Sequence, residues 1–202
     1  MRIPGSIIAR IGLLAGGKAL LISGTCFAVF AAVFFATSAP FAIPHVEELC
    51  GAAPLDVRFH STVGDVEQFL DACGPDGRAA YRNLQIADLV YPIVFGLFMT
   101  SALAVTLKRL APSHPDVVAL AAIGLVGSGF DYLENAFAWR VLAAYPDVGT
   151  AGTLLGFAST AKTVSHWTAG VTLLAGLALL AGRAARHRMT SPHTGQPTPS
   201  LG

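Results

Sequence analysis

Four long apolar segments dominate the chain, and polar residues separate them. Two of the segments carry no charge, one contains two carboxylates, and one contains a lysine and a histidine; they are residues 19–39, 89–107, 117–139 and 149–182. A helix needs roughly 20 mostly apolar residues to cross the hydrocarbon core of a bilayer. The pattern therefore predicts an all-α integral membrane protein, a bundle of four transmembrane helices over about 19–39, 86–108, 117–141 and 153–182.

Basic residues mark three of the polar flanks. They precede the first apolar segment, lie between the second and third, and follow the fourth: Arg2, Arg10, Lys18, Lys108, Arg109, Arg183, Arg186 and Arg188. The long connection over residues 40–85 is rich in acids instead. Because short cytoplasmic flanks carry the excess of Lys and Arg, we expect a multi-pass protein of the bacterial inner membrane, with both termini cytoplasmic and residues 40–85 as an extracytoplasmic loop.

One alternative for the first apolar segment is a cleaved signal peptide, because Thr37, Ser38 and Ala39 offer small residues for cleavage. The apolar core of a signal peptide is 7–15 residues long. The segment 19–39 is longer than that, which favours a membrane span.

Composition narrows the class of protein further. Charged residues make up 12% of the 202 residues, whereas about a quarter is usual in a soluble domain. The formal net charge of +1 gives no global field that would attract nucleic acid. We predict one membrane domain over residues 1–182, followed by a disordered cytoplasmic tail over 183–202, where Pro, Ser, Thr and Gly accumulate.

The long acidic loop contains local helix signals. Thr62 and Asp65 have capping-box spacing, and apolar residues recur after them at helical intervals, which predicts a short amphipathic helix. Residues 74–77, Gly-Pro-Asp-Gly, predict a turn. From Arg78 a helix is expected to run straight into the second span, where Pro92 should kink it and free a backbone carbonyl.

Two of the three cysteines, Cys50 and Cys73, fall in this loop. If the loop faces an oxidising compartment, a disulfide between them is expected. Two free thiols remain the alternative. The chain has no Cys-x-x-Cys motif, which argues against a thiol–disulfide oxidoreductase.

Ionisable residues inside the predicted spans are the candidates for a functional site. Each costs roughly 2.5–3.5 kcal/mol at the centre of a bilayer on the insertion scale. Helical spacing puts them on one face of each of three helices, and their heights, at about 1.5 Å per residue, place them in the outer part of the bundle. We expect these faces to meet in a pocket open to the exterior, lined by Asp88, Tyr91, Asp131, Glu134, Asn135, Lys162 and His166.

These residue types suggest roles. Close carboxylates can supply an acid and a base, so Asp131, Glu134 and His166 are predicted to be catalytic. The binding set is Asp88, Tyr91, Asn135, Arg140 and Lys162, in which the two cations could hold an anionic headgroup such as a phosphate. The same side chains could instead pair across helices and only fix their packing.

No metal or cofactor is predicted. The spans contain no His-x-x-x-His or Glu-x-x-His spacing, and the chain has neither a Gly-x-x-x-x-Gly-Lys-Ser/Thr nor a Gly-x-Ser-x-Gly motif.

A wider pattern resembles a class of uncharacterised small bacterial proteins with four membrane spans. It comprises Gly77-Arg78-x-x-Tyr81, Asp88-x-x-Tyr91-Pro92, the run from Asp131 to Asn135, and Lys162 in the last span. The resemblance covers about residues 60–170. It implies the four-span architecture and no activity.

Together these patterns favour a membrane protein that binds a lipid or another hydrophobic small molecule, with acid–base chemistry of an isomerase, cyclase or hydrolase type. The alternative is a non-enzymatic membrane subunit or a small proton-coupled transporter, in which the same residues form interhelical ion pairs. Either protein would have the bilayer as its surroundings and no nucleic-acid partner.

Overall fold

The computed structural model describes residues 5–190, and within that range all regular structure is helical, which confirms the all-α part of the predicted fold class. The elements in chain order are α1 (Gly5–Leu14), α2 (Gly17–Ala36), α3 (Ile43–Cys50), η1 (Leu55–Val57), α4 (Val63–Asp88), α5 (Tyr91–Leu110), η2 (Pro115–Ala122), α6 (Ile123–Ala144) and α7 (Gly149–Thr190).

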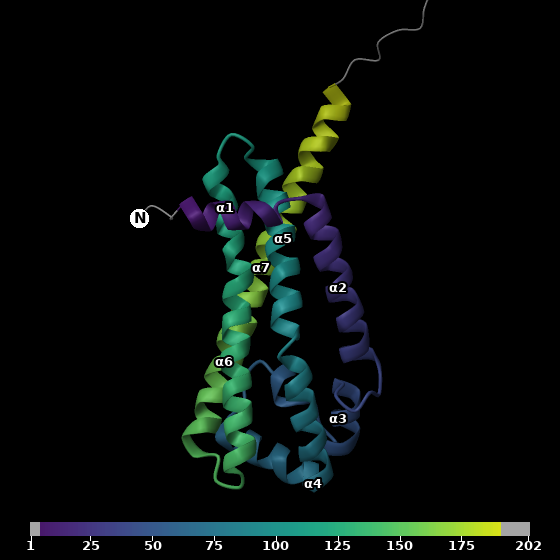
Figure 1. Ribbon diagram of the computed structural model, residues 1–202, viewed down its shortest axis with the longest axis vertical. Helices are drawn as coiled ribbons and strands as arrows, with labels where there is room; N and C mark the ends of the chain where they lie inside the picture. The colour runs from purple at the N-terminus through teal and green to yellow at the C-terminus, as the bar shows by residue number, and fades with distance from the viewer. Residues whose placement is uncertain (1–4, 191–202) are drawn as a thin grey trace, which may run out of the picture.

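Four helices are long and apolar enough to cross a membrane, as the sequence predicts: Gly17–Ala36, Val63–Leu110, Pro115–Ala144 and Gly149–Met189. In Figure 1, α2, α5, α6 and α7 follow the long axis of the molecule. Helix α5 is central, because α2, α6 and α7 all pack against it, and α6 and α7 also pack closely on each other.

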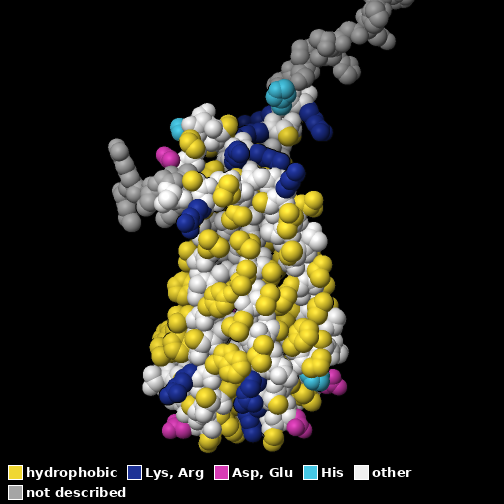
Figure 2. Space-filling view, in the orientation of Figure 1, with side chains coloured by type: hydrophobic (Ala, Val, Ile, Leu, Met, Phe, Trp, Pro, Cys, Tyr) yellow, Lys and Arg dark blue, Asp and Glu magenta, His cyan; other side chains and the backbone are white. Residues whose placement is uncertain are grey.

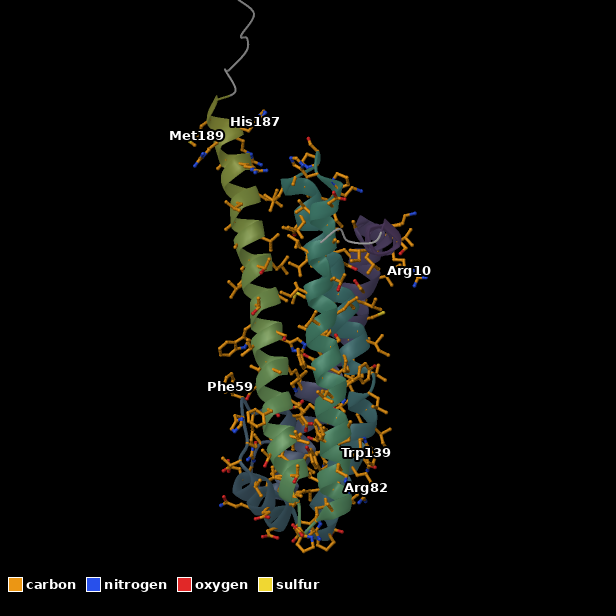
Figure 3. The ribbon with its side chains drawn as sticks, turned by 90° about the vertical axis from the view of Figure 1, so that its left-hand side faces the viewer. Arg10, Phe59, Arg82, Trp139, His187 and Met189 are labelled. Carbon is orange, nitrogen blue, oxygen red and sulfur yellow. A yellow bond between two sulfur atoms is a disulfide. The ribbon has the colours of Figure 1, made fainter. Side chains whose placement is uncertain are left out.

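The two ends of the bundle differ in charge. Lys and Arg side chains gather at the end where α1 lies across the bundle, and a mostly hydrophobic surface separates them from the other end, where most of the visible Asp and Glu lie (Figure 2). We call these the basic end and the loop end. Figure 3 places Arg10 and His187 at the basic end and Arg82 at the loop end.

The loop end is built from α3, η1 and α4, which share one hydrophobic core with the neighbouring ends of α2, α6 and α7. The predicted capping box is present: Thr62 accepts a hydrogen bond from the Asp65 amide, and Asp65 accepts one from the Thr62 amide. Hydrogen bonds from the hydroxyl and then the amide of Thr62 lower the pKa of Asp65. The cap is therefore complete above the ordinary pKa of aspartate and weakens as pH falls below it.

Two local predictions for this region are confirmed in their main points. The chain breaks at Gly74, where two helical segments of α4 meet across a kink, and the φ of 59° there suits glycine. The second segment leads into the second span: it ends at Asp88, and Leu89 and Val90 keep right-handed helical backbone angles. Helix α5 begins at Tyr91 with Pro92 in its first turn.

The break between α4 and α5 leaves backbone carbonyls without helical partners. Pro92 has no N–H for the Asp88 carbonyl four residues earlier, and the Ile93 amide bonds to Val90 instead of Leu89. The predicted loss of a carbonyl partner at Pro92 is thus present, at an irregular turn over Leu89 and Val90 that joins α4 to α5.

One face of helix α6 supplies side-chain donors to carbonyls at the break and just beyond it. Asn135 Nδ2 donates to the Asp88 carbonyl at 3.2 Å, Tyr132 Oη to the Leu89 carbonyl at 2.8 Å, and Ser128 Oγ to the Pro92 carbonyl at 2.7 Å. Buried backbone groups nearly always need such partners. Side chains of α6 therefore fix the position of the break and of Asp88 beside it.

The predicted disulfide joins Cys50 at the end of α3 to Cys73 in α4. Gly77 makes room for it, because a Cβ there would lie 2.9 Å from Cys73 Cβ and 3.0 Å from Cys50 Sγ. The bond fastens α3 to α4 beside the hydrophobic core of the loop end.

The last helix is longer than predicted. Helix α7 has 42 residues and continues to Thr190, eight residues beyond the expected end at 182. Residues 191–202 of the predicted tail lie outside the described residues.

Replacing both loop cysteines should destabilise the protein. Closing a loop of this length by a disulfide is worth about 3 kcal/mol, so Cys50→Ser with Cys73→Ser should lower the melting temperature in detergent by roughly 6–12 °C. The matched control is Cys26→Ser, because Cys26 is an exposed free cysteine. An unchanged melting temperature in the double variant would show that the core of the loop end holds α3 without the bond.

Candidate functional site

The polar cluster is centred on the buried Lys162 of α7. Its Nζ forms an ion pair and a short hydrogen bond with Glu134 Oε2, lies 3.5 Å from Asp131 Oδ1, and donates to the backbone carbonyl of Asp56 at 2.7 Å. Asp131 and Glu134 belong to α6 and are fully buried. One ammonium group therefore joins α6, α7 and η1.

Asp56 is a member of the site that the sequence does not single out. Its side-chain Oδ1 accepts a hydrogen bond from Gln85 Nε2 of α4 at 2.7 Å. The residue lies in η1, which follows α3 in the long loop. Helical spacing cannot align a loop residue with a helix face, so Asp56 could not be told from the other acids of that loop.

A cavity of about 180 Å³ lies beside this cluster. Its wall combines charged groups with aromatic and aliphatic side chains: Phe34, Phe35, Ile43, Asp56, Val57, Leu84, Asp88, Tyr91, Asp131, Lys162 and His166. The most exposed lining residues are Phe35 and Val57, at 44% and 46%. The cavity therefore approaches the surface next to α2 and η1, on an apolar flank.

Several buried polar atoms at the site have no hydrogen-bond partner among the described residues. They include Asp88 Oδ2, Asp131 Oδ2, Glu134 Oε1 and His166 Nε2, whereas Asp131 Oδ1 has only its ion pair with Lys162. Most buried polar atoms in proteins are hydrogen-bonded. Asp88, Asp131 and His166 also line the cavity, so their free atoms are available to a bound group.

The position of His166 depends on a glycine of α6. A Cβ at Gly127 would lie 2.1 Å from His166 Cδ2, which is far too close. On its other side the imidazole ring is 4.5 Å from the ring centre of Phe95. The ring is held between α5 and α6 by shape rather than by a hydrogen bond.

The structure brings most of the predicted site residues together. Asp88, Tyr91, Asp131, Lys162 and His166 line the cavity. Glu134 and Asn135 are buried next to it, where Glu134 pairs with Lys162 and the Asn135 amide serves the Asp88 carbonyl.

Arg140 does not join the site. The sequence groups it with Lys162 as a cation for an anionic headgroup, but its side chain is exposed and is not part of the cavity wall. It lies five residues beyond Asn135, the last buried polar residue of α6, on the exposed side of the helix.

Between residues 5 and 190, no three His, Cys, Asp or Glu side chains are grouped so that they could hold a metal ion.

Comparisons with known proteins give no assignment: no family model, no curated protein and no solved structure matches this chain.

Filling the space at Gly127 should displace His166. We expect Gly127→Ala to destabilise the protein by about 1–3 kcal/mol through overpacking, and to shift the imidazole NMR signals of His166. Gly129→Ala is the matched control on the same helix, because a Cβ there meets nothing within 4 Å. A normal His166 spectrum in Gly127→Ala would show that the ring is not confined as described.

Removing the Lys162 ammonium should strand two buried carboxylates. Lys162→Met should cost about 3–5 kcal/mol of stability, as breaking a buried ion pair does. In the Lys162→Met background, Glu134→Gln should lower the free energy of unfolding by less than it does in the wild type. A double-mutant cycle of unfolding in detergent measures this difference. Arg140→Met, at an exposed cation, is the control; equal losses for Lys162→Met and Arg140→Met would contradict the central role of Lys162.

Proposed function

We propose that the protein is a bacterial inner-membrane protein that binds the polar end of a lipid or another amphiphile in the Lys162 cavity and exchanges protons with it. The observation that carries the proposal is the set of unpartnered carboxylate oxygens in a cavity next to the apolar surface. Buried polar groups without hydrogen-bond partners lower the stability of the folded protein, and a role in ligand binding explains why they are present in this cavity.

The size and position of the cavity support an amphiphile as the ligand. Pockets for whole drug-sized molecules are usually about 300–1,000 Å³, whereas this one is about 180 Å³. It would accept a headgroup or a short polar segment. The apolar surroundings of Phe35 and Val57 would let the hydrocarbon part remain outside, in contact with lipid.

The arrangement of the carboxyl groups supports proton transfer. Glu134 is held by Lys162, whereas Asp88 and Asp131 present free oxygens to the cavity. Asp88 and Asp131 are therefore the groups that could take or give a proton, and His166 Nε2 is a third such atom beside them. An isomerase, cyclase or hydrolase reaction on the bound amphiphile is the type of chemistry these groups could catalyse.

Charge and redox chemistry support an orientation. The basic end would face the cytoplasm under the positive-inside rule. The loop end contains the Cys50–Cys73 disulfide, and disulfides persist on the oxidising, periplasmic side of a bacterial inner membrane. Both termini would then be cytoplasmic, and the cavity would lie nearer the outer surface.

The alternative is a non-enzymatic subunit or a small proton-coupled transporter. The contacts of Lys162 favour it, because they bridge α6, α7 and η1 and would stabilise the bundle without any ligand.

The test compares three variants by native mass spectrometry and thermal unfolding after purification in maltoside detergent. Asp131 Oδ2 accepts no hydrogen bond, and Oδ1 lies 3.5 Å from Lys162 Nζ. Asp131→Asn should therefore lose the amphiphile that co-purifies with the wild type, with a smaller loss of melting temperature than Lys162→Met causes. Asp88→Asn should behave similarly. Asp116→Asn, at an exposed residue of η2, should change neither property.

Two results would overturn the proposal. If the wild type carries no bound amphiphile and takes none up from added lipid extract, the cavity is not a ligand site. If Asp131→Asn unfolds as readily as Lys162→Met, the carboxylate belongs to a structural ion-pair network and the alternative is favoured.

A further inference from the structure

The sign of the charge in the cavity wall points to the chemical class of its ligand. We infer that the bound headgroup is a cation, an amine or quaternary ammonium group on an amphiphile. This inference rests on the proposed function, and it reverses the anionic headgroup that the sequence suggests.

Carboxyl groups outnumber cations at the site. Asp56, Asp88 and Asp131 line the cavity together with a single ammonium group, that of Lys162. Glu134 adds a fourth carboxyl group against the same lysine. Buried charges are stable only when they are paired or neutralised, so a bound cation would offset the excess of acid.

The one lysine in the wall is already engaged. Its Nζ contacts Glu134, Asp131 and the Asp56 carbonyl, which are as many partners as an ammonium has protons. Since Arg140 lies outside the cavity wall, an anionic headgroup would meet carboxylates without a free cation to bind it.

The aromatic part of the wall suits an organic cation. Tyr91 lies beside Phe34 and Phe35, with ring centres 6.1 and 5.8 Å away. All three rings line the cavity, and Lys162 is the only Lys or Arg among its lining residues. Aromatic faces attract ammonium groups, and quaternary ammonium recognition is a common use of this interaction.

Features of the wall argue against an inorganic cation. A hard metal ion takes about six oxygen ligands, whereas much of this wall is hydrocarbon, and no three potential ligand side chains are grouped anywhere between residues 5 and 190. An ammonium group with attached methyl or methylene groups fits a wall that is part carboxylate and part aromatic.

The experiment uses three probes with the same alkyl chain: hexadecyltrimethylammonium, hexadecyl sulfate and hexadecyl glucoside. Each is titrated into the full-length protein in maltoside micelles, and saturable one-to-one binding is followed by native mass spectrometry. The ammonium probe should bind at least about tenfold more tightly than the other two. Its affinity should fall as the pH is lowered, because carboxylates that take up protons no longer attract it.

Variants show whether the probe occupies the cavity. Asp88→Asn and Asp131→Asn should each weaken the ammonium probe by about tenfold or more and flatten its pH dependence. Asp116→Asn, which removes one acid at the basic end, should leave the affinity unchanged and controls for attraction to the protein surface.

The outcomes separate the two proposals. If the sulfate or glucoside probe binds best and the cavity variants weaken it, the amphiphile-binding function stands and the cationic headgroup is wrong. If the ammonium probe binds but ignores Asp88→Asn and Asp131→Asn, it binds elsewhere and the inference fails. If no probe shows saturable binding, both proposals fail.

Discussion

The structure depends on one buried lysine. Lys162 holds Glu134 and Asp131 of α6 from its place on α7, and it also holds the backbone of η1 through the Asp56 carbonyl. Helix packing and the placement of the loop over the bundle are therefore coupled through a single ammonium group. Because burying that charge is costly without partners, any arrangement that separates the two helices or lifts the loop carries a large penalty.

The break before α5 is the second constraint, and it explains why polar residues of α6 have different duties. Asn135 and Tyr132 donate hydrogen bonds to the carbonyls of Asp88 and Leu89, which lack helical partners at the break. Asp131 and Glu134, interspersed with them, face Lys162 instead. The five-residue run 131–135 thus has two roles: Tyr132 and Asn135 hold the backbone at Asp88, and Asp131 and Glu134 provide acidic groups beside the cavity.

Sequence periodicity predicted the parts of the site that lie on long helices and missed those that do not. Asp88, Asp131, Lys162 and His166 come together because spacing along a helix determines its faces. Asp56 depends on tertiary contacts that no local pattern encodes, whereas the break before Tyr91 has a local signal in Pro92. Helix α3 was not predicted either, although Pro44 lies in its first turn, a position that suits proline.

The same limit explains the reversal in ligand charge. Counting residues on predicted spans gave a site with two cations, Lys162 and Arg140, and so an anionic headgroup. Three-dimensional placement removes Arg140, saturates Lys162 with acidic and carbonyl partners, and adds Asp56 to the wall. The predicted set has three carboxyl groups and two cations, whereas the structure has four carboxyl groups and one cation, so moving two residues raises the excess of acid from one group to three. Recognition of an amphiphile by this protein then follows from which side chains reach the cavity, and not from which charges the spans contain.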